Sequence, residues 1–183
     1  WGDSRTYKFM HLPIQSGSQK ILDSMLRDHT LEDFWEVVET FRQYYPEMMI
    51  ITDIITGFPG ETDEDHQKTV DLLNRLLPDL VNLTRFSPRQ GTPAARYKRV
   101  NSNTVKARSK ELTELRKKLG AKSFKRFVGR KTSVLAVENQ RQGSTLCRDD
   151  NYRPIIIKEE LPLGEFYDVE IIDSDYAFLT AVL

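Results

Sequence analysis

Polar side chains lie at two points where this sequence passes from an apolar run into a glycine-containing turn. His11, Gln15 and Ser16 belong to the string HLPIQSGS, and Asp53 interrupts an apolar run that leads into the string GFPG. A carboxylate inside an apolar segment needs a partner or a function. Glycines before a helix let the backbone approach a ligand at the exposed amide groups. The pattern predicts a ligand site. The alternative is that these residues are structural: His11 would be a core histidine, the serines would cap a helix, and Asp53 would hydrogen-bond to a neighbouring strand or loop.

The elements that position these residues alternate between strand and helix. Apolar runs predict strands at 7–14, 48–55 and 80–86, and the middle one is apolar enough to be buried on both faces. Helices are expected to begin after Ser18, Thr30 and Thr62. This strand–helix order predicts parallel α/β packing, which places ligand sites at the carboxyl ends of the strands.

A strongly basic segment separates two acidic ones, although the net charge of the 183-residue chain is zero. Residues 1–95 carry a charge of −6, residues 96–131 carry +12, and residues 132–183 carry −6. A helix is predicted over 104–126 with only a thin apolar stripe. The charge favours contact with a polyanion such as RNA, and the alternative is a solvated helix that pairs with the acidic flanks.

The last part of the chain has a different pattern. Five short strands are predicted, separated by turn residues; they cover 131–137, 144–148, 153–158, 166–172 and 176–182. Five strands in so short a segment indicate a small β-barrel of the OB type. The sequence therefore predicts two domains, at 1–126 and 127–183, the first ending in the basic helix.

Cysteine and apolar content exclude several classes of protein. Cys147 is the only cysteine, so the chain has no internal disulfide, and a reducing, cytoplasmic compartment is expected. One thiol also cannot hold an iron–sulfur cluster. No apolar run approaches the roughly 20 residues of a membrane span, so no membrane contact is expected.

Three strings in order along the chain resemble one enzyme family. They are HLPIQSGS, TDIITGFPGET at 52–62 and SPRQGTPAA at 87–95, and together they resemble the radical S-adenosylmethionine (SAM) methylthiotransferases of the MiaB/RimO type. The β-rich end is similar to the TRAM domain of these enzymes, and the string NYRPIIIK at 151–158 resembles the archaeal and eukaryotic branch. The implied fold is α/β: the C-terminal half of a radical-SAM, partial TIM-like barrel followed by a small OB-like TRAM barrel.

This resemblance implies a function in tRNA modification. The family adds a methylthio group to C2 of N6-threonylcarbamoyladenosine in tRNA, using SAM and [4Fe–4S] clusters. The cluster cysteines are absent from this chain, so the resemblance also implies an absent N-terminal domain and first barrel half, and no activity of this chain alone. The alternatives are a MiaB-like enzyme acting on isopentenyladenosine, a noncatalytic RNA-binding module, or an unrelated α/β enzyme using His11 and Asp53.

The resemblance carries specific residues with it. The residues implied at the SAM site are Gln15, Ser16, Arg27, Asp53, Ile55 and Gly57. The sequence departs from the family pattern at Asp28-His29 and at Gln90, which leaves the shape of the loop around residue 28 open.

RNA contacts are expected from a second set, in which Arg89 lies on the substrate side, Tyr152 stacks on a base and the other cations meet phosphates. The set comprises Arg89, Lys117, Lys118, Lys122, Lys125, Arg126, Arg130, Lys131, Arg148, Tyr152 and Arg153. The open sheet edges of a half-barrel also predict self-association.

Overall fold

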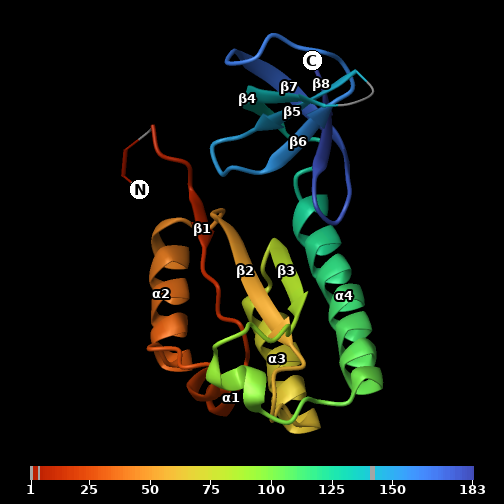
Figure 1. The fold of residues 1–183 in the computed structure, drawn as a ribbon. Coiled ribbons are helices and arrows are strands. Elements are labelled where there is room, and N and C mark those ends of the chain that lie inside the picture. The colour runs from red at the N-terminus through yellow and green to blue at the C-terminus, as the bar shows by residue number, and fades with distance from the viewer. Residues whose placement is uncertain (1, 4, 141–142) are drawn as a thin grey trace.

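The computed structural model describes residues 2–3, 5–140 and 143–183, and it has two parts joined by a long helix. One part is a three-stranded sheet with helices packed on it, and the other is a closed barrel of five strands (Figure 1). The predicted fold class, a partial α/β barrel followed by a small β-barrel, is confirmed. The long helix leads directly from one part into the other.

The sheet is wholly parallel and has the order β1-β2-β3. Its strands are β1 (Phe9–His11), β2 (Met49–Thr56) and β3 (Leu80–Arg85). β1 is shorter than the predicted 7–14; beyond its end the Ile14 N–H donates to the Thr52 hydroxyl oxygen and not to a backbone oxygen of β2. The chain still follows β2 after Pro13, since Gln15 forms an isolated parallel bridge with Ile54.

The helices begin close to where the sequence predicts. They are α1 (Gln19–Ser24), α2 (Leu31–Tyr44), α3 (Asp63–Leu76), the 3₁₀ turn η1 (Pro93–Arg96) and α4 (Ser102–Lys125). Thr30 and Thr62 each form a capping box with the aspartate three residues on, as expected for α2 and α3. Ser18 precedes α1, but its side chain makes no cap hydrogen bond; the hydroxyl instead donates to a carboxylate on α3.

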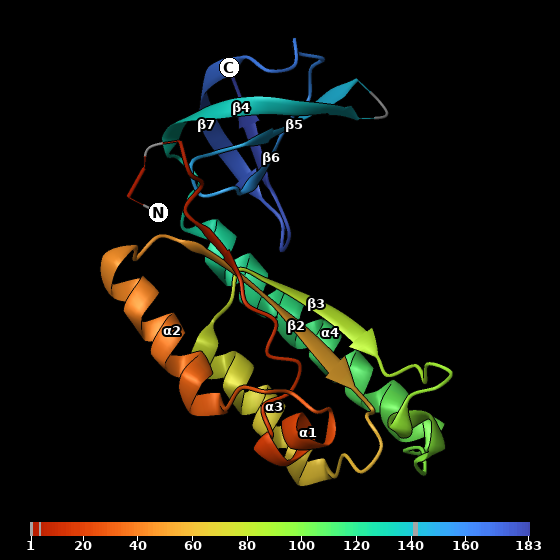
Figure 2. The same cartoon turned by 60° about the vertical axis from the view of Figure 1, so that its left-hand side comes forward.

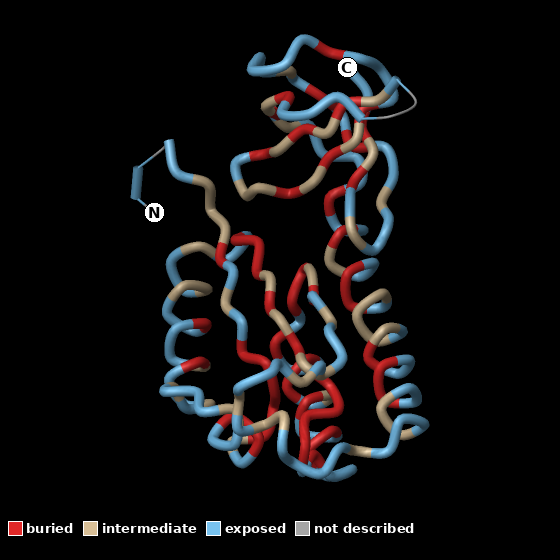
Figure 3. The backbone as a smooth tube through the Cα atoms, viewed as in Figure 1, coloured by how far each residue is buried: buried red, intermediate tan, exposed pale blue. Residues whose placement is uncertain are grey.

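The helices cover one face of the sheet, and the first core lies between them (Figure 2). Met10, Ile50, Ile54 and Val81 point into this core from the three strands. The prediction that β2 is buried on both faces is wrong, because buried and half-buried residues alternate along it. In this chain the second face is covered only at its amino-terminal end, where the barrel packs on it (Figure 3).

The barrel closes in the strand order β4-β5-β6-β8-β7. Its strands are β4 (Lys131–Gln140), β5 (Ser144–Arg148), β6 (Pro154–Ile157), β7 (Phe166–Ser174) and β8 (Leu179–Val182). β6 and β8 are parallel and the other pairs are antiparallel, which is a Greek-key arrangement of the OB kind. β8 starts three residues later than predicted, since 175–178 form the turn from β7.

A buried arginine joins the barrel to the sheet. Arg153 is 2% exposed and donates from Nη1 to Asp149 Oδ2 at 2.8 Å. Its Nη2 donates to the backbone oxygen of Glu47, which lies just before β2. The guanidinium also stacks over Phe127, 4.0 Å from the ring centroid. Arg153 therefore ties the barrel to the linker after α4 and to the start of β2.

An aromatic cluster continues this junction. The rings of Tyr7 and Phe9 each lie 5.0 Å from the ring of Tyr152, measured between centroids. The backbone N–H of Lys8 donates to the oxygen of Asp150 at 2.7 Å. Met49 of β2 is itself part of the barrel core. The two parts of the chain therefore share apolar packing at the amino-terminal end of the sheet.

No described helix combines the length and the apolar character needed to cross a membrane.

The buried ion pair at the junction predicts a large effect on stability. Replacing Arg153 by Met leaves the Asp149 carboxylate buried without its cation, so we expect the free energy of unfolding to fall by about 3–5 kcal/mol. Urea denaturation followed by circular dichroism measures this change. The matched control is Arg99→Met, because Arg99 is exposed; equal losses in both variants would contradict the structural role of Arg153.

Candidate functional site

A cleft of about 620 Å³ opens at the carboxyl ends of β2 and β3. The segment 84–97, which includes η1, forms one side of it, and the turn after α1 forms the other. Side chains that project into the cleft include Gln15, Arg27, Ile55, Phe58, Phe86 and Arg89. The position agrees with the rule that parallel α/β sheets bind ligands beyond the carboxyl ends of their strands.

Gln15 and Arg27 form a hydrogen-bonded pair in the cleft. Gln15 has a left-handed backbone, with φ of 75°, and its N–H and C=O bond to Asp53 and Ile55 of β2 on either side. These bonds direct its side chain into the cleft, where Oε1 accepts from Arg27 Nη2 at 2.8 Å. Arg27 is exposed, so its guanidinium can also meet a carboxylate or a hydroxyl group of a ligand.

Two phenylalanines give the cleft an aromatic wall that sequence reasoning did not assign to the site. Phe58 follows β2 and Phe86 follows β3, and their rings pack edge to face with centroids 5.0 Å apart. Together with Ile55 they offer an apolar surface against which a heterocycle can pack. Their signal in the sequence is position alone, since Phe86 directly follows β3 and Phe58 lies two residues after β2.

Three residues expected at the SAM site do not line the cleft, and two of them, Ser16 and Gly57, are buried beside it. Ser16 is 1% exposed, and its hydroxyl accepts from the Ser18 N–H and lies 3.5 Å from Thr69 Oγ1 of α3. Gly57 is buried, and its N–H donates to Glu61 Oε2 at 2.9 Å. Both residues shape the loops beside the cleft, because their polar groups are used within the protein.

Asp53 lies on the open face of the sheet, outside the cleft. Its Oδ1 is 2.9 Å from His11 Nε2 and accepts from Asn82 Nδ2 at 2.9 Å. The side chains of His11 and Asp53 are 43% and 31% exposed, so His11 is not a core histidine. Asp53 therefore links three strands by hydrogen bonds, as the alternative of a structural role for this residue predicts.

Asp65 of α3 anchors the loop that carries Gln15. Its carboxylate accepts from the Ser18 hydroxyl, the Lys20 ammonium and the backbone and side chain of Thr62. Burial pushes the pKa of the Asp65 carboxyl upward, but the hydrogen bonds from Lys20, Thr62 and Ser18 outweigh it and hold the pKa well below its usual range. The ionised carboxylate thus joins α1 to the start of α3.

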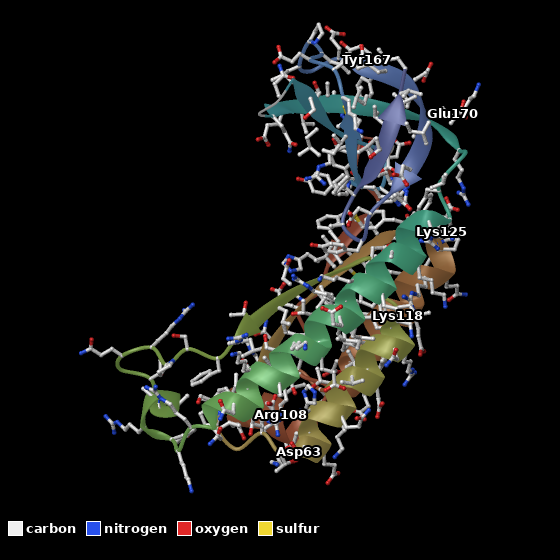
Figure 4. All side chains as sticks on the ribbon, turned by 90° about the vertical axis from the view of Figure 1, so that its right-hand side faces the viewer. Asp63, Arg108, Lys118, Lys125, Tyr167 and Glu170 are labelled. Atoms are coloured by element: carbon white, nitrogen blue, oxygen red, sulfur yellow. The ribbon has the colours of Figure 1, made fainter. Side chains whose placement is uncertain are left out.

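The basic residues of α4 divide into separate stripes. Lys118, Lys122 and Lys125 are exposed and recur at helical spacing, so they share one side of the helix. Lys117 is about 100° away around the helix axis, and its ammonium lies 3.5 Å from Glu114. Figure 4 shows Lys118 and Lys125 on the part of α4 that approaches the barrel. The expected basic surface is therefore narrower than the sequence suggests.

The cations beyond α4 are partly neutralised. Arg126 lies 3.6 Å from Asp79, and Arg130 lies 2.9 Å from Glu47. Lys131 is exposed at the start of β4.

The structure corrects the expected RNA contacts of the barrel. Arg153 is buried in its pair with Asp149, so it cannot meet a phosphate without breaking that pair. Tyr152 is half-buried, packs against Tyr7 and Phe9, and has the Arg148 guanidinium 4.2 Å from its ring centroid. In this structure Arg153, Tyr152 and Arg148 help to hold the two parts of the chain together.

Cys147, the single thiol, lies in the barrel core and is fully buried. Burial raises the pKa of this thiol, which disfavours the thiolate that metals bind. Among the described residues, no group of three or more His, Cys, Asp and Glu side chains is arranged to hold a metal ion. The residues present therefore do not fit an iron–sulfur cluster.

Comparison with known proteins places this cleft in a family. The model of the radical SAM superfamily matches residues 3–73. A probable threonylcarbamoyladenosine tRNA methylthiotransferase of Archaeoglobus fulgidus is 43% identical over 183 residues, which are 100% of this chain and 43% of that protein. Over its whole length the chain is similar to threonylcarbamoyladenosine tRNA methylthiotransferases, and its first part matches the radical SAM superfamily. It spans less than half the length of the curated relatives it matches.

Other relatives of this chain come from distant organisms. A threonylcarbamoyladenosine tRNA methylthiotransferase of Xenopus laevis is 33% identical over 96% of the chain and 32% of that protein. A tRNA-2-methylthio-N(6)-dimethylallyladenosine synthase of Magnetococcus marinus is 39% identical over 91% of the chain and 39% of that protein.

A solved structure supports the fold of this chain. The radical SAM enzyme coproporphyrinogen III oxidase of Escherichia coli superposes with a TM-score of 0.53 and 16% identity. The match covers 62% of this chain and 27% of that one, and it concerns the fold alone.

The buried carboxylate of Asp65 predicts a pH-dependent loss of stability in Asp65→Asn. Because the folded-state pKa is depressed, the stabilisation is fully present above the unfolded value of about 3.9 and is lost as the pH falls below it. We expect a deficit of about 2 kcal/mol at pH 7 that shrinks toward pH 3, measured by denaturant titration. The control is Asp71→Asn, at an exposed position of the same helix; a deficit that is equal at both pH values would contradict the proposed linkage.

Proposed function

We propose that this chain forms one wall of the SAM site and part of the RNA surface of a radical SAM enzyme that methylthiolates threonylcarbamoyladenosine in tRNA. The observation that carries the proposal is the 43% identity over the whole chain with a relative that bears this name. The cleft at the carboxyl ends of β2 and β3 supports it, because a nucleoside-sized ligand fits its volume and its mixed lining.

The cleft residues suit the chemical groups of SAM. The edge-to-face pair of Phe58 and Phe86 offers an apolar wall for the adenine. Arg27 carries the positive charge that a carboxylate requires, and its bond to Gln15 limits the directions it can point. When bound, SAM and the clusters supply the radical chemistry and the transferred group; these residues bind and orient, and they carry out no step themselves.

The RNA surface would include the stripe of Lys118, Lys122 and Lys125. Val105 backs the loop beside the cleft, and Lys122 is seventeen residues further along the same helix. At a rise of 1.5 Å per residue these two positions are about 26 Å apart. An RNA with one base near the cleft and its phosphate backbone on the lysine stripe must span that distance. A structured RNA such as tRNA is large enough to do so. Arg89, exposed at the cleft, is the proposed contact on the substrate side.

Two alternatives follow from specific observations. The Magnetococcus marinus relative is named as a tRNA-2-methylthio-N(6)-dimethylallyladenosine synthase, and its identity to this chain, 39%, is close to the 43% of the Archaeoglobus fulgidus relative. This relative supports a MiaB-like substrate. The burial of Cys147 supports a chain that binds RNA without catalysing a reaction, because its only thiol is inaccessible. The whole enzyme would need clusters held by residues of another segment or subunit.

Arg27→Met is expected to reduce SAM affinity about tenfold, the size expected for one lost charge-assisted hydrogen bond. The ligand 5′-methylthioadenosine lacks the carboxylate, so its affinity should change much less. Calorimetric titration of the chain with each ligand measures the difference. Arg99→Met, at an exposed arginine that does not line the cleft, serves as the control. An equal loss for both ligands would place Arg27 away from the carboxylate, and no SAM binding by the parent chain would contradict the proposed cleft.

The lysine stripe predicts a salt-dependent affinity for tRNA. Reversing Lys118, Lys122 and Lys125 to Glu should weaken binding and flatten the slope of log affinity against log salt by about 2 to 3. The matched control reverses Lys106, Lys110 and Lys117, which share another side of α4. Filter binding over a salt series compares the two triple variants. Equal effects would mean that net charge, and not the stripe, attracts the RNA.

A further inference from the structure

The loop between β2 and α3 forms a wall of the cleft but has no rigid secondary structure of its own. Ile55 at the end of β2 and Phe58 in the loop contribute side chains to the cleft, and Gly57 lies between them. The loop is held from behind: the N–H of Gly57 donates to Glu61 Oε2 at 2.9 Å. Glu61 is only 6% exposed, so this carboxylate needs a buried cation.

Arg108 of α4 supplies that cation. Its Nη1 donates to Glu61 Oε2 at 2.6 Å and to the Glu61 backbone oxygen at 3.1 Å. Its Nη2 donates to Asp63 Oδ1, in the first turn of α3, at 2.6 Å. Arg108 is 6% exposed and does not line the cleft. Figure 4 shows Arg108 beside Asp63, near the end of α4 that lies away from the barrel.

The same helix touches the loop at a second point. Gly57 has a φ of +79°, and a Cβ built on it would lie 2.6 Å from a methyl group of Val105. Val105 precedes Arg108 by three residues, so both side chains project from one side of α4. The backbone of the loop is therefore enclosed between the Glu61 carboxylate and α4.

We propose that Arg108 is a positioning residue for the nucleoside cleft, acting through Glu61 and the Gly57 N–H without touching the ligand. Its guanidinium pairs with the Glu61 carboxylate and orients it, and this carboxylate fixes the turn that directs Ile55 and Phe58 into the cleft. Loss of Arg108 leaves a buried negative charge, and the loop must move to hydrate it. The role in ligand binding rests on the proposed function, whereas the role in holding the loop does not.

Two variants separate positioning from general stability. Arg108→Met removes the cation and keeps the apolar stem, and we expect the affinity for SAM to fall about tenfold. Adding Glu61→Gln removes the uncompensated charge while leaving an amide oxygen for the Gly57 N–H. The double variant should therefore regain most of the lost affinity. Lys110→Met, at an exposed lysine of α4, is the matched control and should match the parent.

Amide hydrogen exchange without ligand tests the loop itself. Arg108→Met should accelerate exchange at Gly57 by about tenfold, and the double variant should slow it again. Faster exchange together with unchanged SAM affinity would overturn the role in binding. Unchanged exchange at Gly57 in a folded Arg108→Met variant would overturn the positioning role, whatever the SAM affinity. A parent chain that does not bind SAM but shows the predicted exchange would refute the proposed function alone.

Discussion

Strand β2 is hydrogen-bonded on both sides, and most of the structure depends on this constraint. Its register with β1 and β3 places the carboxyl ends of three segments together, where the cleft forms. Its alternation directs Ile50 and Ile54 toward the helices and leaves Asp53 on the open face. Its amino-terminal end supplies Met49 to the barrel core. One strand thus relates the cleft, the helical layer and the barrel, because β1 and β3 are hydrogen-bonded to it in a defined register.

Helix α4 is the second element that relates distant parts of the chain. Near its start, Arg108 and Val105 hold the loop beside the cleft, and near its end Phe124 enters the barrel core. At Gly120 the backbone oxygen of Tyr176, in the β7–β8 turn, approaches so closely that a side chain would not fit. The helix therefore fixes the position of the barrel relative to the loop beside the cleft. For the same reason, its lysine stripe lies at a fixed distance from the cleft.

Buried charges join neighbouring elements at three places. Arg108 pairs with Glu61 between α4 and the loop after β2, Arg153 pairs with Asp149 at the barrel junction, and Asp65 accepts from α1 and the α3 cap. Such pairs contribute little net stability compared with apolar packing, but removing one partner is costly. Their value here is geometric, since each guanidinium or carboxylate accepts only a narrow range of orientations.

Local features of the sequence were sufficient for much of this fold. The capping boxes at Thr30 and Thr62, the apolar run of β2 and the five β-strands were predictable, because capping and alternation depend on residues close in the chain. The three strings that resemble the methylthiotransferases also identified the cleft loops. Only the tertiary structure decided which polar groups face the cleft: Gln15 and Arg27 do, whereas Ser16, Gly57 and Arg153 are used within the protein. The physical reason is that a buried polar group binds whichever partner packing brings within reach. Ser16 meets Thr69, 53 residues away, and Arg153 meets Glu47, 106 residues away, and the local sequence does not reveal such partners.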